Sequence, residues 1–191
     1  GLYGQPADMD EINEIATQYN LKVIIDGAQS FGATYKNKAE VHHCGIYTTS
    51  FFPAKPLGCY GDGGAIFTNN DEYADLLRSY RVHGKGSDKY DNIRIGMNSR
   101  LDTIQAAVLL AKLAHYPQEL ADRQQVAQRY TDALSGRLQT PVVKSNRSSA
   151  WAQYTVRVNN RDDLQAKLKG NGIPTADITQ CHFTCKNVSN I

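Results

Sequence analysis

Residues 21–33 read LKVIIDGAQSFGA, a short apolar run that ends on a carboxylate and continues into a turn of small residues. An apolar run of this length is typical of a buried parallel strand. Asp26 therefore lies where a parallel strand ends, and open α/β sheets place their ligands at this edge. The stretch predicts both the class of fold and the place of a functional site.

Helical and strand-like patterns alternate around this run. Apolar residues at helical spacing follow Asp8, which suits the N-cap position of a helix. The expected elements up to residue 80 are helices over 9–19 and 71–80 and strands over 21–25, 46–52 and 64–68. Helices and strands joined by short connections predict a layered α/β sheet.

The second half of the chain is mainly helical. The sequence predicts a long loop over 81–98, helices over 101–116 and 118–138 on either side of Pro117, a strand over 151–158 and a helix over 162–169. A helical passage of this kind often joins two domains. We expect residues 1–116 to be part of a large domain, residues 117–176 an incomplete small domain and residues 177–191 an atypical tail.

Composition excludes several classes of protein. The chain has 191 residues, 41% hydrophobic and 21% charged, and its formal net charge is +2. These values exclude disorder, and the scattered basic residues give no electrostatic footprint for nucleic acid. No apolar run approaches the roughly 20 residues that a membrane span needs. With no signal-peptide pattern at its start, the chain is expected to be cytoplasmic, without a nucleic-acid or membrane partner.

The four cysteines are interpreted as reduced thiols. Cys181 and Cys185 flank His182, and His42-His43-Cys44 forms a second short cluster. A zinc site would need further ligands that neither neighbourhood offers. No metal is expected.

The chemistry-bearing stretches are 26–33, 50–55 (SFFPAK) and 61–65 (GDGGA). Lys55 follows a strand end, as Asp26 does. An amine and a carboxylate at one sheet edge suit pyridoxal phosphate, because the lysine forms the Schiff base and the aspartate pairs with the pyridinium nitrogen. Considered alone, Lys55 also fits an ordinary surface lysine, Asp26 fits a turn residue, and residues 61–64 fit a glycine turn.

The ordered set of motifs resembles the sugar-nucleotide aminotransferases of the DegT/DnrJ/StrS family. The matching motifs are LYGQPADMD (2–10), residues 26–33, residues 49–68 and GMNSRLD (96–102), and the resemblance runs from residue 1 to about 176. It implies the three-layer α/β fold of pyridoxal-phosphate-dependent transferases (the aspartate aminotransferase, type I, fold). The chain would hold a partial large domain and the start of a small C-terminal domain. Residues 50–64 look most like the enzymes that aminate UDP-2-acetamido-2-deoxy-3-oxo-glucuronate.

The resemblance also implies site residues and partners. Lys55 would hold the cofactor and move the proton, Asp26 would pair with its ring nitrogen, Gln29 would lie near its phenolic oxygen and Ser50 would bind its phosphate. The family works as a homodimer with shared active sites. Asn98 would therefore reach the neighbouring subunit's cofactor phosphate, Arg100 would approach the nucleotide-sugar there, and the loop 81–98 would cross the interface.

The sequence departs from the family in two ways. Family chains are about twice this length, and roughly the first 150 residues of their pattern are absent, which would leave an exposed sheet edge. After Ala176 the family continues His-Tyr-Pro-x-Pro-Leu-His, whereas this chain continues DITQCHFTCK. One permitted set of codons for this tail, read from its third base, encodes His-Tyr-Pro-Val-Pro-Phe-His-Leu-Gln. We hypothesise a frameshift near Asp177, which the coding DNA would test.

The function expected is transfer of an amino group, with glutamate as donor, to a UDP-linked 3-oxo sugar for surface polysaccharide and lipopolysaccharide precursors. The alternative is a non-catalytic truncated remnant of such an enzyme. A nucleotide-binding module without pyridoxal phosphate fits less well, because neither a Gly-x-Gly-x-x-Gly nor a Gly-Lys-Ser/Thr arrangement is present.

Overall fold

The structure is a computed structural model that describes residues 1–88 and 90–177. The chain divides into two compact units, Gly1–Thr155 and Val156–Ile191. The first unit contains η1 (Leu2–Gly4), α1 (Met9–Gln18), β1 (Ile24–Asp26), β2 (Thr34–Tyr35), β3 (Lys38–Ala39), η2 (Glu40–His43), β4 (Ile46–Ser50), β5 (Gly64–Phe67), α2 (Asp71–Arg81), α3 (Thr103–Leu113) and α4 (Tyr116–Leu134). The second contains α5 (Arg161–Gly170).

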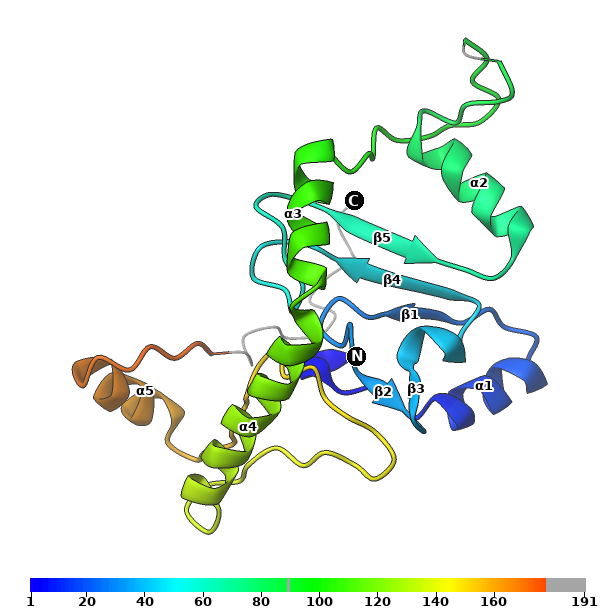
Figure 1. Cartoon of the computed structure of the whole chain (residues 1–191). Coiled ribbons are helices and arrows are strands. Elements are labelled where there is room, and N and C mark those ends of the chain that lie inside the picture. Colours follow the sequence, from blue (N-terminus) through cyan, green and yellow to red (C-terminus); the bar gives the residue numbers. More distant parts are fainter. Residues whose placement is uncertain (89, 178–191) are drawn as a thin grey trace, which may run out of the picture. The chain divides into compact units, whose positions relative to one another are not determined.

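The core of the first unit is a three-stranded sheet of order β1-β4-β5 (Figure 1). β1 is parallel to β4, and β5 is antiparallel to β4. All three strands were predicted, with small shifts at their ends. The β-branched residues of β1 and β4 favour the extended conformation. Strands β2 and β3 form a separate short antiparallel hairpin.

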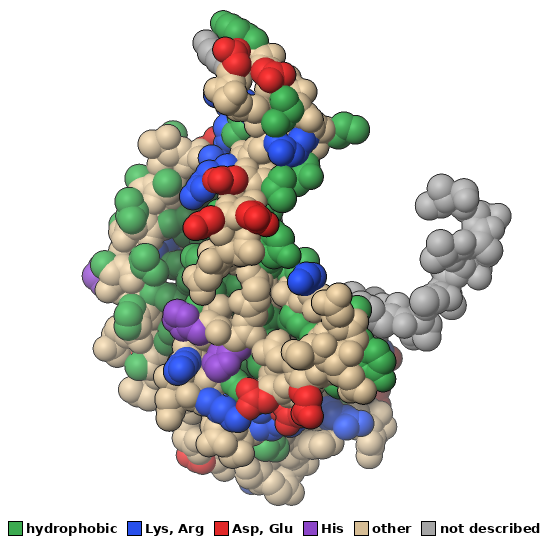
Figure 2. Space-filling view, turned by 90° about the vertical axis from the view of Figure 1, so that its right-hand side faces the viewer, with side chains coloured by type: hydrophobic (Ala, Val, Ile, Leu, Met, Phe, Trp, Pro, Cys, Tyr) green, Lys and Arg blue, Asp and Glu red, His purple; other side chains and the backbone are tan. Residues whose placement is uncertain are grey.

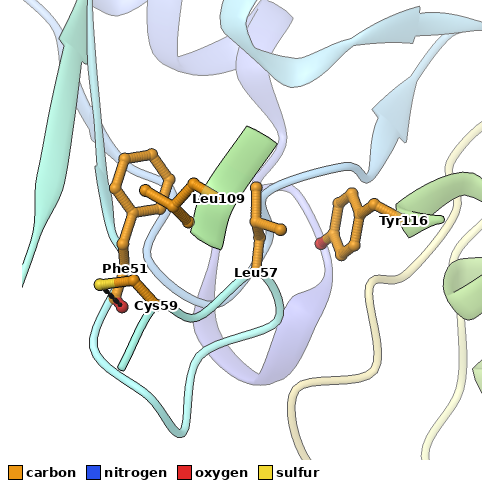
Figure 3. Packing of buried hydrophobic residues seen from close by; sticks show 5 residues of the cluster. All are labelled: Phe51, Leu57, Cys59, Leu109 and Tyr116. Carbon is orange, nitrogen blue, oxygen red and sulfur yellow. Dashed lines mark hydrogen bonds between the residues drawn. The ribbon is translucent and has the colours of Figure 1, made fainter. Parts of the chain in front are cut away.

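Two buried clusters lie on one face of this sheet. Residues two apart in a strand point to the same face, so Ile25, Tyr47 and Phe67 share a face through their register. Near α1, Ile25 and Tyr47 pack with Met9 and Tyr35. Along α3, a second cluster joins Phe51, Leu57, Cys59, Leu109 and Tyr116 (Figure 3). Phe31 packs against both clusters and therefore connects them.

The starts of α2 and α4 follow the local chemistry, whereas the start of α1 does not. Asn70 caps α2, because its Oδ1 accepts a hydrogen bond from the Tyr73 backbone N–H at 2.9 Å. Pro117 lies in the first turn of α4, where its missing N–H costs nothing, so α3 and α4 are separate helices as predicted. Asp8 stands at the N-cap of α1, but its side chain makes no cap hydrogen bond and pairs with Lys144 and Arg147 instead.

The strand predicted over 151–158 is wrong: this segment contains no strand in the part of the chain that the structure describes. Trp151 has a positive φ of 48°, which interrupts an extended run. The neighbouring backbone pairs with the turn of η1 rather than with a strand, since Ala150 N–H donates to the Gly4 carbonyl at 2.8 Å. Local alternation of residue types did not reveal this partner.

The predicted loop over 81–98 folds back on itself. Val82 pairs with Asn98 and Lys85 with Asn92 in isolated antiparallel bridges. Gly84 has φ +71°, and a Cβ there would lie 1.8 Å from the Arg94 carbonyl oxygen, so the close approach requires glycine. Figure 1 shows this segment projecting beyond α2.

The domain boundary predicted at 116/117 falls in the first turn of α4, within the first compact unit. The assignment of 117–176 to a small domain stays a prediction. Of the predicted tail 177–191, residues 178–191 lie outside the described part of the chain. The structure therefore leaves the frameshift hypothesis untested.

Candidate functional site

Asp26 and Ser50 stand at the carboxyl ends of the two parallel strands. Asp26 is the last residue of β1, aligned with Thr48, and Ser50 ends β4 opposite Gly64 of β5. Parallel strands end at the same edge of a sheet, so both side chains belong to one edge. Asp26 lies at the end of its strand as predicted, whereas Ser50 was expected inside a strand over 46–52 and instead ends β4. The roles of both residues stay predictions.

The turn after β1 is shaped by contacts with β4. Asp26 is exposed, and one of its carboxylate oxygens, Oδ1, accepts a hydrogen bond from Ala28 N–H at 3.0 Å. A Cβ on Gly27 would lie 1.9 Å from the Tyr47 hydroxyl oxygen. Glycine is therefore required beside Asp26 if the Tyr47 ring is to pack against the turn.

Gln29 is oriented by a residue far away in the sequence. Its Oε1 accepts a hydrogen bond of 2.6 Å from the backbone N–H of Tyr3, whose φ is +62°. The side-chain amide therefore keeps its NH₂ group as the donor for another partner. Sequence reasoning placed Gln29 in the site but missed Tyr3. A backbone N–H donor in a strained turn cannot be recognised from the type of residue that carries it.

A buried carboxyl group supports the same turn. Glu40 is almost fully buried, accepts a hydrogen bond from the Ser30 hydroxyl and lies 3.4 Å from the Tyr47 hydroxyl. Its other oxygen has no hydrogen-bond partner in the described part of the chain. Burial away from water raises the pKa of Glu40 and also that of Tyr47. Sequence reasoning missed Glu40, which stands in a polar run typical of a surface turn.

Lys55 is half-buried in the loop that joins β4 to β5. Its backbone N–H donates to the Phe52 carbonyl at 2.8 Å. The loop closes on itself, because the Cys59 N–H and thiol both donate to the Phe51 carbonyl, at 2.8 and 3.0 Å (Figure 3). A Cβ on Gly58 would lie 2.6 Å from the Pro53 carbonyl oxygen, so this tight path also requires glycine.

The helices hold the outer side of this loop. Lys112 Nζ donates to the Gly58 carbonyl, Arg123 donates to the Pro56 carbonyl at 3.0 Å, and Gln105 accepts from the Tyr60 N–H at 2.8 Å. These contacts span α3 and α4. Fixed by both helices, the loop can present Lys55 in a constant position.

Asn98 and Arg100 lie between α2 and α3, and both are exposed. Arg100 donates from Nε and Nη2 to Asn98 Oδ1, at 3.1 and 2.8 Å. The structure thus pairs these two residues with each other. Their approach to a neighbouring subunit stays a prediction.

A surface hollow lies away from these residues. It measures about 390 Å³ and is lined by Asp8, Asp10, Lys36, Lys144 and Arg147, among others, and by none of the predicted site residues. Acidic and basic groups there pair with one another. Figure 2 shows one side of the molecule, where hydrophobic side chains reach the surface beside charged and histidine side chains.

The described residues include no group of three or more side chains that could hold a metal ion. Cys181, His182 and Cys185 lie outside them. Nor does any helix in that part of the chain have the length and apolar character needed to cross a membrane.

Comparison with known proteins gives consistent matches. The model of the DegT/DnrJ/EryC1/StrS aminotransferase family matches residues 1–187. The UDP-2-acetamido-2-deoxy-3-oxo-D-glucuronate aminotransferase of Pseudomonas aeruginosa is 54% identical over 176 residues, which are 92% of this chain and 49% of that protein. The chain spans about half the length of the curated relatives it matches.

Solved structures confirm the fold. A DegT DnrJ EryC1 StrS aminotransferase from Brucella abortus matches with a TM-score of 0.86 and 51% identity, over 91% of this chain and 46% of that one. NtdA from Bacillus subtilis, solved with its bound cofactor PMP, matches with a TM-score of 0.80 and 31% identity, over 89% of this chain and 40% of that one. These matches confirm the predicted pyridoxal-phosphate-dependent transferase fold for the part of that fold that this chain spans. The chain belongs to the DegT/DnrJ/EryC1/StrS aminotransferase family.

Proposed function

We propose that the chain is the lysine-bearing part of a pyridoxal-phosphate-dependent aminotransferase that acts on a keto-sugar nucleotide. The observation that carries the proposal is the placement of Asp26 and Ser50 at one sheet edge, with Lys55 in the anchored loop after β4. Membership of an aminotransferase family and the PMP bound to NtdA support the choice of cofactor.

The residues present fit this cofactor. The aldehyde needs an amine, the ring nitrogen a carboxylate, the phenolic oxygen a hydrogen-bond donor, and the phosphate hydroxyl or amide donors. In this chain, Lys55 supplies the amine and Asp26 supplies the carboxylate. The NH₂ group of Gln29 supplies the donor for the phenolic oxygen, and the Ser50 hydroxyl supplies a donor for the phosphate. Asp26 also keeps Oδ2 available, because Ala28 uses only Oδ1.

Pyridoxal phosphate, when bound, supplies an aldehyde that exchanges amines and a ring that accepts the electrons left by a departing proton. The Asp26 carboxylate would hold the ring nitrogen in its protonated form. The Lys55 amine would bind the aldehyde carbon and, once displaced, carry the proton at Nζ between substrate and cofactor. The rigid loop keeps this amine in place for both tasks.

The substrate, donor and assembly extend the same proposal. The name of the P. aeruginosa relative supports a UDP-linked 3-oxo sugar as amino acceptor. We assign glutamate as donor, surface polysaccharide precursors as product class and the cytoplasm as location. In a homodimer with shared active sites, Asn98 would reach the neighbouring phosphate and Arg100 the neighbouring nucleotide-sugar.

Borohydride trapping tests the proposal. Purified chain mixed with pyridoxal phosphate and reduced should carry a covalent adduct on the peptide that contains Lys55, located by mass spectrometry. Lys55→Ala should lose this adduct, whereas Lys22→Ala, which removes an exposed lysine before β1, should keep it. Equal labelling of both variants would contradict the role of Lys55.

The same experiment addresses the second candidate, a non-catalytic chain. This candidate is favoured by the span of about half the relatives' length. It predicts a folded protein that traps no cofactor on Lys55. Saturable trapping followed by amino transfer from glutamate would exclude it.

A further inference from the structure

Glu40 is a buried carboxyl group that the proposed chemistry does not use. Only 1% of the residue is exposed, and its oxygen Oε1 has no hydrogen-bond partner in the described part of the chain. Burying such a group costs free energy, and an apolar side chain of similar volume would cost less. Stability alone therefore does not explain a glutamate at this position, and the explanation has to come from the contacts of its other oxygen, Oε2.

Two hydroxyl groups approach Oε2, and both belong to segments that form the proposed site. The buried Ser30 hydroxyl, in the turn after β1, donates a hydrogen bond to Oε2. The Tyr47 hydroxyl, on β4, lies 3.4 Å from the same oxygen and 3.5 Å from the Gly27 carbonyl oxygen. Glu40 itself lies in η2, after the β2–β3 hairpin. It therefore connects a third segment to the turn and to β4.

The turn 27–30 is held at both ends. At its start, the Gly27 N–H donates to the Thr48 carbonyl of β4 at 2.8 Å, and the Gly27 carbonyl accepts from the Ser30 N–H at 3.1 Å. At its end, the Ser30 side chain is held by Glu40. The second anchor of the turn is thus the buried carboxyl group.

Two residues of the proposed cofactor site depend on this turn. Asp26 directly precedes it, and Gln29 lies within it, directly before Ser30. The Asp26 carboxylate and the Gln29 amide would contact different atoms of one planar ring, so their relative placement has to be precise. A shift of Ser30 would move Gln29 relative to Asp26.

We propose that Glu40 is a positioning residue: by holding the Ser30 hydroxyl, it fixes the turn that places Gln29 relative to Asp26. It acts through Ser30 rather than on the cofactor itself. The inference rests on the proposed function and deepens it, because the placement of these two side chains matters for chemistry only if the cofactor binds at this edge of the sheet.

Four substitutions separate the hydrogen bond from charge and from packing. Glu40→Leu keeps the volume and removes the acceptor, and Ser30→Ala removes the donor. Glu40→Gln keeps an acceptor oxygen, and it should replace the glutamate because burial raises the pKa of Glu40 and so favours the uncharged carboxyl. Val41→Ala is the matched control, since Val41 is the next residue of η2, packs half-buried against the cluster near α1 and has no polar side-chain atom.

Amide hydrogen exchange of the cofactor-free chain is the first measurement. Glu40→Leu and Ser30→Ala should each speed exchange in the peptide that spans residues 26–31 by about tenfold, because the turn opens more often once its second anchor is lost. The double variant should add little, since both changes remove the same bond. Glu40→Gln and Val41→Ala should exchange as the wild type does. Circular dichroism checks that each variant folds, and Ser30→Ala decides the outcome if Glu40→Leu does not fold.

Borohydride trapping of pyridoxal phosphate on Lys55 is the second measurement. Glu40→Leu and Ser30→Ala should raise the half-saturating cofactor concentration by about tenfold, because the turn must be ordered before the ring can bind. The amount trapped at saturation should not change, since Lys55 lies in a separate loop that Lys112 and Arg123 hold. Glu40→Gln should restore the wild-type concentration, and Val41→Ala should leave it unchanged.

The outcomes distinguish this inference from the proposed function. Wild-type exchange rates in both Glu40→Leu and Ser30→Ala would overturn the inference, and so would faster exchange with an unchanged half-saturating concentration. A turn as loose in Glu40→Gln as in Glu40→Leu would also overturn it. If the wild-type chain traps no cofactor on Lys55, the proposed function alone is contradicted, and the exchange rates decide whether Glu40 fixes the turn.

Discussion

Gly27 shows how strictly a single position beside the site is specified. A Cβ there would lie 1.9 Å from the Tyr47 hydroxyl oxygen, whereas a Cβ on Gly45 would meet nothing within 4 Å. Tyr47 is itself buried under the turn, so it cannot easily move aside. Because Gly27 has no side chain, the Tyr47 ring can pack directly against the turn that follows Asp26.

We expect Gly27→Ala to lower the free energy of unfolding by about 1–3 kcal/mol, the usual cost of overpacking a buried site. Gly45→Ala should change it by no more than about 0.5 kcal/mol. Urea unfolding followed by tyrosine fluorescence gives both values. Equal effects of the two substitutions would show that the Tyr47 contact does not constrain Gly27.

Glu40 should make stability depend on pH. Because burial raises its pKa above the ordinary value of 4.5, the folded protein holds the proton where the unfolded chain has released it. The free energy of unfolding should therefore fall as pH rises through this range. Glu40→Gln keeps the shape without the ionisation, so its stability relative to the wild type should increase with pH.

Unfolding midpoints from pH 4 to pH 8 measure this difference. Glu14→Gln, which removes an exposed carboxylate on α1, is the control and should follow the wild type. A pH-independent difference between Glu40→Gln and the wild type would mean that Glu40 does not titrate in this range.

At the scale of elements, helices α3 and α4 fix the loop that carries Lys55. Lys112 Nζ donates to the Gly58 carbonyl from α3. Lys112→Met should cost about 1–2 kcal/mol, as expected for loss of a partly shielded hydrogen bond from a charged group. It should also make residues 51–63 more sensitive to limited proteolysis, whereas Arg129→Met on the exposed side of α4 should do neither.

The start of α1 is tied to the segment after α4. Asp8 accepts from Arg147 at 2.7 Å and from Lys144 at 2.6 Å. Arg147 also donates to the Pro6 carbonyl and lies over the Tyr35 ring at 5.0 Å, and only 7% of its side chain is exposed. Lys144 and Arg147 thus pair with the same carboxylate, but the Lys144 side chain is exposed and the Arg147 side chain is buried.

Arg147→Ala should therefore lower the urea midpoint of unfolding at least about twofold more than Lys144→Ala, because exposed ion pairs contribute little. The Lys144 effect should shrink further in 1 M salt, where screening is strong. Similar losses for both variants would show that the Tyr35 and Pro6 contacts of Arg147 add no stability.

At the scale of the whole molecule, the projecting segment 82–98 gives an expectation for assembly. Ile95 lies on the returning side of this segment and is 97% exposed. If the segment crosses between subunits as proposed, Ile95→Glu should shift the chain toward monomer in analytical ultracentrifugation. Ile66→Glu, at an exposed position on β5, is the control and should not. A dimer insensitive to Ile95→Glu would rule out this route between subunits.

Sequence reasoning succeeded where the signal is local. The apolar runs of β1, β4 and β5 and the Pro117 break each depend on residues within a few positions of one another. It failed for 151–158, whose backbone partner lies near residue 3. The same limit hid Glu40, because burial depends on what packs around a residue rather than on its neighbours in the chain.

The amino-acid sequence by itself determined the family, the order of the motifs and the strand-end position of Asp26, because spacing and side-chain chemistry carry that information. Only the tertiary structure showed that Asp8 pairs with Arg147, 139 residues away, and that Tyr3 orients Gln29. These features arise from contacts between distant segments, and such contacts exist only once the chain has packed.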